Sequence, residues 1–232
     1  MPDDYPPFPG FRDEAFAFLK DLAQHNERDW FKPRKETFTD EVQWPLRCLV
    51  ADAARQATHH DLSFSGDPKR SLFRIYRDTR FSKNKQPYKT HASAVLSRTG
   101  RRKEPGGLYL HIEPGHCFLA AGFWKLETPV LRRWRSRIAG EPAAFLDVRQ
   151  RLEATGLTLE TRESLKRMPR GFEDYAETDV AEVLRWKSFT TSRSFPDSAL
   201  KTPDFTADVV QMMQDVLPLM EYGWELEDEP VG

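Results

Sequence analysis

A change in hydrophobic periodicity near residue 71 most constrains the fold. Between residues 12 and 53, apolar residues recur at intervals of three and four, which is typical of amphipathic helices. From Ser71 the apolar residues instead alternate with polar ones, and four such segments follow in succession: 71–76, 90–98, 108–113 and 117–124. Consecutive strands joined by turns pair antiparallel. The sequence therefore predicts an α+β fold, with a mainly antiparallel sheet of about four to six strands packed with N-terminal and C-terminal helices.

Helix signals occur on both sides of this strand region. Helices are expected over about 12–25, 33–53, 128–138, 142–154 and 205–220. Pro45 should kink or split the second of these, because proline removes a helical N–H. Gly156 should end the fourth, since glycine adopts the left-handed cap conformation. Segments 157–160 and 187–195 are the remaining strand candidates.

The chain is expected to form one domain over residues 1–232, with mobile ends at about 1–7 and 225–232. No internal repeat or long linker divides it. Cys48 and Cys117 are far apart and lack spaced partners, which argues against a disulfide framework or a structural zinc site and favours the cytoplasm. The N-terminal segment lacks the apolar run of a signal peptide, and nowhere do 18 apolar residues follow one another, so no membrane partner is expected.

Positive charge is concentrated in one part of the chain. Residues 67–103 contain twelve Lys and Arg against two acidic residues, a local charge of +10. Because the whole chain carries −1, the remainder carries −11. Such a local concentration can hold an anionic partner although the protein is nearly neutral.

Residues 74–89, RIYRDTRFSKNKQPYK, carry the centre of this charge. The end of the first predicted strand runs directly into a basic loop, 77–89, which leads to the second predicted strand. Arginine offers a planar fork to phosphate or carboxylate, and lysine offers a mobile point charge. The loop is therefore predicted to bind a phosphate-bearing small molecule or another polyanion. The candidate ligand-binding residues are Arg77, Asp78, Arg80, Ser82, Lys83, Lys85, Tyr88 and Lys89.

The aromatic and acidic neighbours of these cations have more than one reading. Tyr88 either stacks on a ligand base or anchors the loop to the core, Trp124 is a second candidate stacking surface, and Asp78 can orient a guanidinium. The alternative function is a non-enzymatic interaction or structural module whose basic loop binds an acidic partner or the chain's own acidic tail, 221–229. Nucleic acid is not favoured, because the sequence pI is about 6.6 and the positive charge is local.

No motif fixes a reaction or a cofactor. The sequence lacks GxxxxGK[ST], GxGxxG and GxSxG, so a phosphate cradle of the glycine-rich type and a nucleophile elbow are both excluded. Whether a reaction is catalysed stays open, as does the oligomeric state. The acid or base candidates near the loop are Asp78, His91, His111 and Glu113.

A metal site is not predicted. His111, Glu113 and His116 could converge around a turn, with donors that suit zinc. However, this spacing arises easily by chance, and no second cluster supports it. Cys117 lies within an apolar strand and is expected to be an inert, buried thiol.

The segment RDTRFSKNKQPYK, followed by GGLYLHIEPG, AAGFWKLE, MPRGF and LRWKSF, resembles a widespread family of uncharacterised bacterial and fungal proteins, a domain of unknown function. Its signature, RDxRFSKxKxPYK, is the basic loop itself, and the resemblance covers nearly the whole chain. It implies one domain without an assigned activity, and it carries over no catalytic residue. Because the signature coincides with the loop, the resemblance favours a functional site there.

Overall fold

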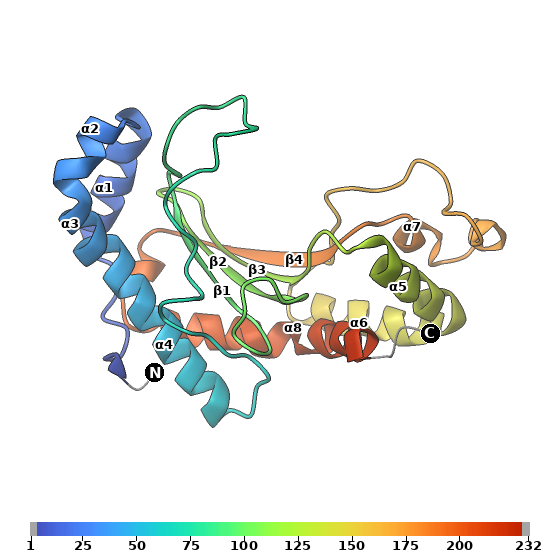
Figure 1. The fold of residues 1–232 in the computed structure, drawn as a ribbon. Helices are drawn as coiled ribbons and strands as arrows, with labels where there is room; N and C mark the ends of the chain where they lie inside the picture. The colour runs from blue at the N-terminus through green and yellow to red at the C-terminus, as the bar shows by residue number, and fades with distance from the viewer. Residues whose placement is uncertain (1–3, 229–232) are drawn as a thin grey trace. The chain divides into compact units, whose positions relative to one another are not determined.

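A four-stranded antiparallel sheet forms the centre of the fold (Figure 1). The computed structural model describes residues 4–228 of the protein. The strands are β1 (Ala92–Leu96), β2 (Gly107–Ile112), β3 (Cys117–Phe123) and β4 (Phe189–Phe195), in the order β1-β2-β3-β4. The predicted α+β class is confirmed, with a strand count at the lower end of the expected range.

The predicted strand over 71–76 is not regular, because it changes partner halfway. Its first half bonds to β1, where the Phe73 N–H donates to the Ser93 oxygen at 2.9 Å. Its second half bonds to the returning end of the basic loop, through an isolated bridge between Tyr76 and Tyr88. The candidate strand 157–160 likewise contributes only an isolated bridge.

The chain divides into two compact units. The first consists of residues up to Glu104, 108–119 and 193–213, and the second of 105–107, 120–192 and 214 onward. Strands β3 and β4 and helix α8 (Phe205–Asp228) each begin in one unit and end in the other. The expectation of one domain stays a prediction, and its mobile ends fall partly on 1–3 and 229–232, outside the described residues.

Helices dominate the N-terminal part of the first unit. They are α1 (Asp13–Gln24), α2 (Arg28–Phe31), the 3-10 helix η2 (Lys32–Arg34), α3 (Lys35–Thr37), the π-helix η3 (Phe38–Gln43) and α4 (Trp44–His59), followed much later in the chain by the 3-10 helix η5 (Ala199–Lys201). Pro45 lies in the first turn of α4, directly after the π-helical stretch. The Trp44 N–H there donates to Thr39, five residues earlier, so a wider turn accommodates the proline without a break in the helical backbone.

The core of the first unit fixes which face of the sheet carries polar side chains. On β1 and β2, the even-numbered residues are buried and apolar, among them Ala94, Leu96 and Leu110, and α4 packs against β1. Successive side chains on a strand point to opposite faces. Ser93, Tyr109 and His111 therefore share the other face of the sheet.

The second unit contains α5 (Thr128–Gly140), α6 (Pro142–Ala154), the 3-10 helix η4 (Glu173–Tyr175) and α7 (Ala181–Leu184). Trp134 of α5 is fully buried and stacks on Phe189 with ring centroids 4.2 Å apart. Gly156 follows α6 with a φ of 78°, as the cap signal predicted. Among the described residues, none of the helices combines the length and apolar character needed to cross a membrane.

Two carboxylates of the acidic tail pair with α5. Glu225 lies 3.6 Å from an Arg137 nitrogen, and Glu227 lies 3.9 Å from one of Arg133. These residues belong to the helical end of α8, within the second unit. The tail therefore has partners on α5, which weighs against its use as the partner of the basic loop.

Candidate functional site

The two ends of the basic loop, 77–89, are held together firmly. The Arg77 N–H donates to the Pro87 oxygen at 2.9 Å, and the buried Tyr88 stacks on Phe31 with ring centroids 4.2 Å apart. The amide of the buried Asn26 accepts from the Tyr88 N–H at 3.0 Å and donates to its carbonyl at 3.1 Å. This packing is the anchoring role considered for Tyr88, and its part in ligand binding stays a prediction.

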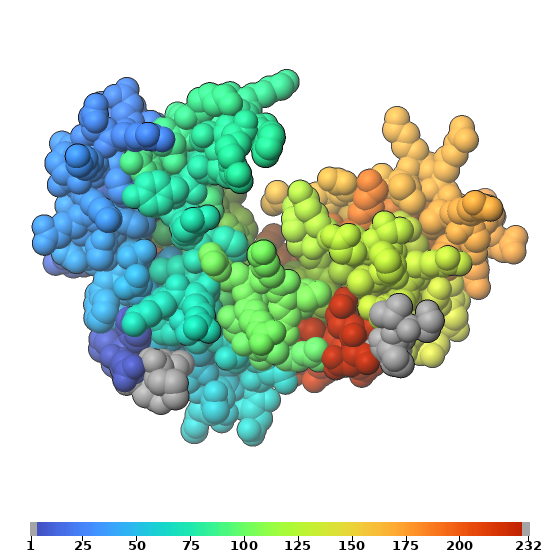
Figure 2. All heavy atoms as spheres, in the orientation of Figure 1, coloured from blue at the N-terminus to red at the C-terminus, as the bar shows by residue number. Residues whose placement is uncertain are grey.

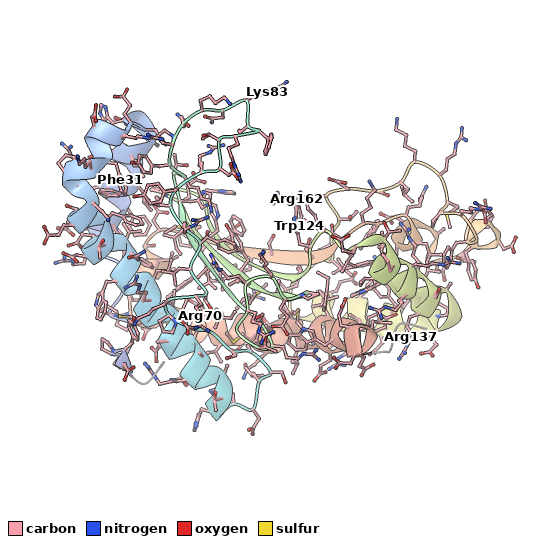
Figure 3. All side chains as sticks on the ribbon, in the orientation of Figure 1. Phe31, Arg70, Lys83, Trp124, Arg137 and Arg162 are labelled. Carbon is pink, nitrogen blue, oxygen red and sulfur yellow. The ribbon has the colours of Figure 1, made fainter. Side chains whose placement is uncertain are left out.

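The outer part of the loop protrudes from the surface of the first unit (Figure 2). Asp78 accepts two hydrogen bonds from the Arg80 guanidinium, at 3.0 and 2.7 Å, and this pairing lowers the pKa of Asp78 to about 2. Lys85 donates to the Thr79 carbonyl at 3.0 Å. Lys83 is exposed at the far end of the loop (Figure 3), with the half-exposed Ser82 beside it in sequence. Asp78, Arg80 and Lys85 therefore bond within the loop, and of the predicted ligand residues in this outer part Asp78 alone is in the lining of the two cavities described below.

Arg77 and Lys89, at the base of the loop, do line a cavity. It has a volume of about 310 Å³ and is bounded by Arg77, Asp78, Lys89, Thr90 and His91. Lys89 lies over the Phe73 ring, 5.2 Å from its centroid. Burial, reinforced by nearby arginines, lowers the pKa of Lys89.

A second cavity of about 530 Å³ lies on the helical side of the loop base. Its lining is Arg28, Asp29, Phe31, Lys32, Lys35, Tyr76, Arg77, Thr79, Pro87 and Tyr88. Arg77 lines both cavities. The helical residues that line the second cavity, 28–35, lie more than 40 positions before it in the sequence. Sequence reasoning missed the three helical cations, because no spacing rule connects residues 28–35 to residue 77.

Behind the first cavity, three of the candidate acid or base residues come together. Donor atoms of His91, His111 and Glu113 all lie within 4.8 Å of one another. The pairing of β1 and β2 explains this, since Ala92 pairs with Ile112 and Ser93 with His111. Extending this register by one residue sets His91 opposite Glu113 and diagonal to His111.

We define His91, His111 and Glu113 as the histidine cluster, and hydrogen bonds hold two of its members, His111 and Glu113. The Nε2 atom of His111 lies 3.2 Å from Oε2 of Glu113, and the Tyr109 hydroxyl lies 3.1 Å from Nδ1 of the same ring. Thr90 donates to the other oxygen of Glu113, Oε1, at 2.8 Å.

The protonation states of the cluster follow from its surroundings. Burial, with the neighbouring His111, lowers the pKa of His91 to about 4, and burial also lowers the pKa of His111. Burial alone would raise the pKa of Glu113, but hydrogen bonds from Thr90 and His111 outweigh it and lower the value. At neutral pH the two imidazoles are therefore neutral and the carboxylate is ionised, so the cluster can accept protons or donate lone pairs.

Three other residues singled out from the sequence take different positions. His116 is exposed, and its Nδ1 lies 3.5 Å from Oε2 of Glu113, at the edge of the cluster. The third member of the cluster is instead His91, which the sequence-based ligand set left out. Trp124 belongs to the second unit, where Arg162 lies over its ring at 5.2 Å (Figure 3). Cys117 is buried, and burial raises the pKa of its thiol to about 12, as expected for an inert thiol.

Fold and site together define an α+β protein with a basic loop at one edge of an antiparallel sheet, two cation-lined cavities at the base of that loop, and a histidine cluster beside one of them. The chain belongs to the DUF2461 family of conserved hypothetical proteins, whose model matches residues 14–222. Neither the curated proteins nor the solved structures include a match to this chain. The match confirms the expected membership in a family of unknown function, and it brings no assigned activity.

Proposed function

We propose that the protein binds a phosphate-bearing small molecule at the two cavities that share Arg77. The supporting observation is the charge of their lining. Five cations contribute to the lining, namely Arg28, Lys32, Lys35, Arg77 and Lys89, against two carboxylates, those of Asp29 and Asp78. Asp78 is already neutralised by Arg80, so the net charge facing the cavities is strongly positive.

In the described part of the chain, four of the five cations are not held by an acidic partner. Within residues 4–228, Arg28, Lys32, Lys35 and Arg77 form no salt bridge within 4.0 Å. Like charges brought together without partners cost free energy, and a bound anion relieves that cost. The Arg77 guanidinium can bind two phosphate oxygens at once, which gives the ligand a defined orientation.

The second cavity also offers an aromatic surface. Tyr76 is 53% exposed and packs edge-on to Phe31, with ring centroids 6.2 Å apart. An exposed ring beside cations can stack on a planar organic group. The best-matched ligand is therefore a phosphate ester with an aromatic or other apolar part, such as a nucleotide, whereas a long nucleic acid lacks a broad basic face to follow.

An accompanying reaction would use the histidine cluster, because His91 lines the first cavity. With no metal ion on its ring, the neutral His91 imidazole can act as a general base beside a bound phosphate ester. The proposal also includes a cytoplasmic location, because both cysteines are free and buried, which fits a reducing compartment.

A thermal-shift panel of inorganic phosphate, nucleotides and sugar phosphates tests the binding proposal. A ligand that binds only the folded state raises the melting temperature. For the compound with the largest shift, Arg77→Gln should weaken binding at least about 10-fold, as expected for a lost charge-assisted hydrogen bond. Arg74→Gln is the matched control, since Arg74 is exposed, three residues away, and lines neither cavity. No stabilisation by any compound, or equal losses in the two variants, would contradict the proposal.

A second candidate function, binding of an acidic protein partner, is favoured by one observation. Phe81 at the outer part of the loop is 95% exposed, with Arg80 and Lys83 on either side in sequence. An exposed aromatic ring among cations is typical of residues that dominate protein interfaces. Co-purification of a partner that is lost in Phe81→Ser and kept in Arg77→Gln would favour this candidate over the small-molecule proposal.

A further inference from the structure

We infer that His91, His111 and Glu113 form a binding site for one divalent transition-metal ion. The site does not depend on phosphate binding, because it shares only His91 with the lining of the first cavity. Its three donors come from the start of β1 and the end of β2, which are held in register by the strand pairing. Two imidazoles and one carboxylate are a common ligand set for zinc and related ions.

The distances between donors match such an ion. Tetrahedral zinc with bonds of about 2.0–2.1 Å separates its ligand atoms by about 3.3 Å. Nε2 of His111 and Oε2 of Glu113 are 3.2 Å apart, so these two already have the required separation. All three donors lie within 4.8 Å, and a side-chain movement of at most about 1.5 Å brings His91 to the same spacing.

The surrounding residues orient the ligand atoms as outer partners do in metal proteins. Tyr109 lies 3.1 Å from Nδ1 of His111, which leaves Nε2 as the ligating nitrogen. Thr90 donates to Oε1 of Glu113 at 2.8 Å, which leaves Oε2 as the ligating oxygen. Phe118 stacks on the His111 ring, with centroids 4.5 Å apart, and fixes its plane. The two remaining ligand atoms, Nε2 of His111 and Oε2 of Glu113, lie 3.2 Å apart and face each other.

The donor set also selects the kind of ion. Calcium and magnesium prefer six or more oxygen ligands, and this site offers one carboxylate. Nitrogen donors favour zinc and its first-row neighbours. With three protein ligands, a four-coordinate ion keeps one position for water or a ligand oxygen, which is the arrangement of catalytic zinc sites.

Titration of the chelator-stripped, full-length protein with Co²⁺ tests this site. The expected result is one equivalent per chain with a visible ligand-field spectrum, and displacement by Zn²⁺. Because a three-ligand site depends on each donor, His111→Ala and Glu113→Gln should each weaken binding at least about 100-fold. Thr90→Val and Tyr109→Phe should weaken it about 10- to 100-fold, the usual effect of losing an outer partner.

Two controls keep the test specific. His59→Ala removes an exposed histidine that pairs only with His60, and it should leave binding unchanged. Arg77→Gln should weaken phosphate binding at least about 10-fold and leave metal binding unchanged, so failure of one proposal is distinguishable from failure of the other. Circular dichroism confirms that each variant is folded. Absence of a saturable Co²⁺ spectrum in the wild-type protein, or equal affinity in a folded His91→Ala/His111→Ala variant, would overturn the inference.

Discussion

Single residues at the base of the loop decide which of its side chains face a ligand. Asn26 bonds both backbone groups of the buried Tyr88, and this pair ties the loop to the turn between α1 and α2. Asn26→Ala leaves a buried N–H and a buried carbonyl without a side-chain partner. Each such group costs about 1–3 kcal/mol. The free energy of unfolding, measured by urea denaturation, should therefore fall by at least the cost of one group, about 1–3 kcal/mol.

Asn84→Ala is the matched control for this prediction. Asn84 is exposed and bonds only its neighbour Gln86. Its loss should change the free energy of unfolding by less than about 0.5 kcal/mol, as for most surface substitutions. Equal effects of the two alanine substitutions would show that Asn26 does not anchor the loop.

The two cysteines give a second prediction at this scale. Both thiols are buried, and burial raises the pKa of Cys48 as well as that of Cys117. The thiolate is the reactive form, so neither should react with a water-soluble disulfide reagent at pH 8 in the native protein. After denaturation both thiols should react with the reagent. Rapid labelling of the native protein would contradict this prediction.

Residue types in the sequence identified the loop, but they could not show which cations reach a cavity. Arg80 and Lys85 bond within the loop because their partners, Asp78 and Thr79, are only two and six residues away. Arg28 and Lys32 come from a helical segment about 50 residues earlier. Their approach depends on Tyr88 stacking on Phe31, a tertiary contact that periodicity does not reveal.

At the scale of elements, strand register rather than strand identity creates the histidine cluster. β1 and β2 were both predicted from alternation, yet their pairing depends on the connection across residues 97–106. A shift of one residue would move every side chain to the opposite face. That is why sequence reasoning grouped His111 and Glu113 with the nearby His116, while the register places His91 opposite Glu113.

The close approach of β3 to β4 gives a prediction for these elements. Gly122 has a φ of 125°, and a Cβ added there would lie 2.1 Å from the Phe189 carbonyl oxygen. Gly122→Ala therefore combines backbone strain with overlap against a backbone atom, and should lower the free energy of unfolding by at least about 3 kcal/mol. Thermal denaturation followed by circular dichroism measures this.

Gly140→Ala serves as the control for that substitution. Gly140 ends α5, and nothing lies within 4 Å of an added Cβ. Alanine there should be neutral or stabilising by up to about 1 kcal/mol, because it restricts the unfolded chain. A stable Gly122→Ala protein with an unchanged melting temperature would show that the strands do not approach as closely as described.

Over the whole molecule, the near-neutral total charge limits what the basic region can bind. The proposed site supplies five cavity cations as phosphate contacts, and the remainder of the chain outside residues 67–103 carries −11 in total. Single-stranded nucleic acids show a slope of about 0.7 per contact in plots of log affinity against log salt. We therefore expect a slope no steeper than about 3.5 for a short oligonucleotide, measured by fluorescence anisotropy, and a much steeper slope would indicate a broad nucleic-acid-binding face.

Nuclear magnetic resonance of the ¹⁵N-labelled protein during titration with inorganic phosphate tests the central claim, that Arg77 is the centre of an anion site. The account predicts saturable shifts of the Arg77 side-chain Nε–H and of the Thr90 and His91 amides, because these residues line one cavity. The Arg80 side chain, engaged by Asp78, should shift far less. Saturable shifts centred on Arg80 and Lys83, or none at Arg77, would contradict the account.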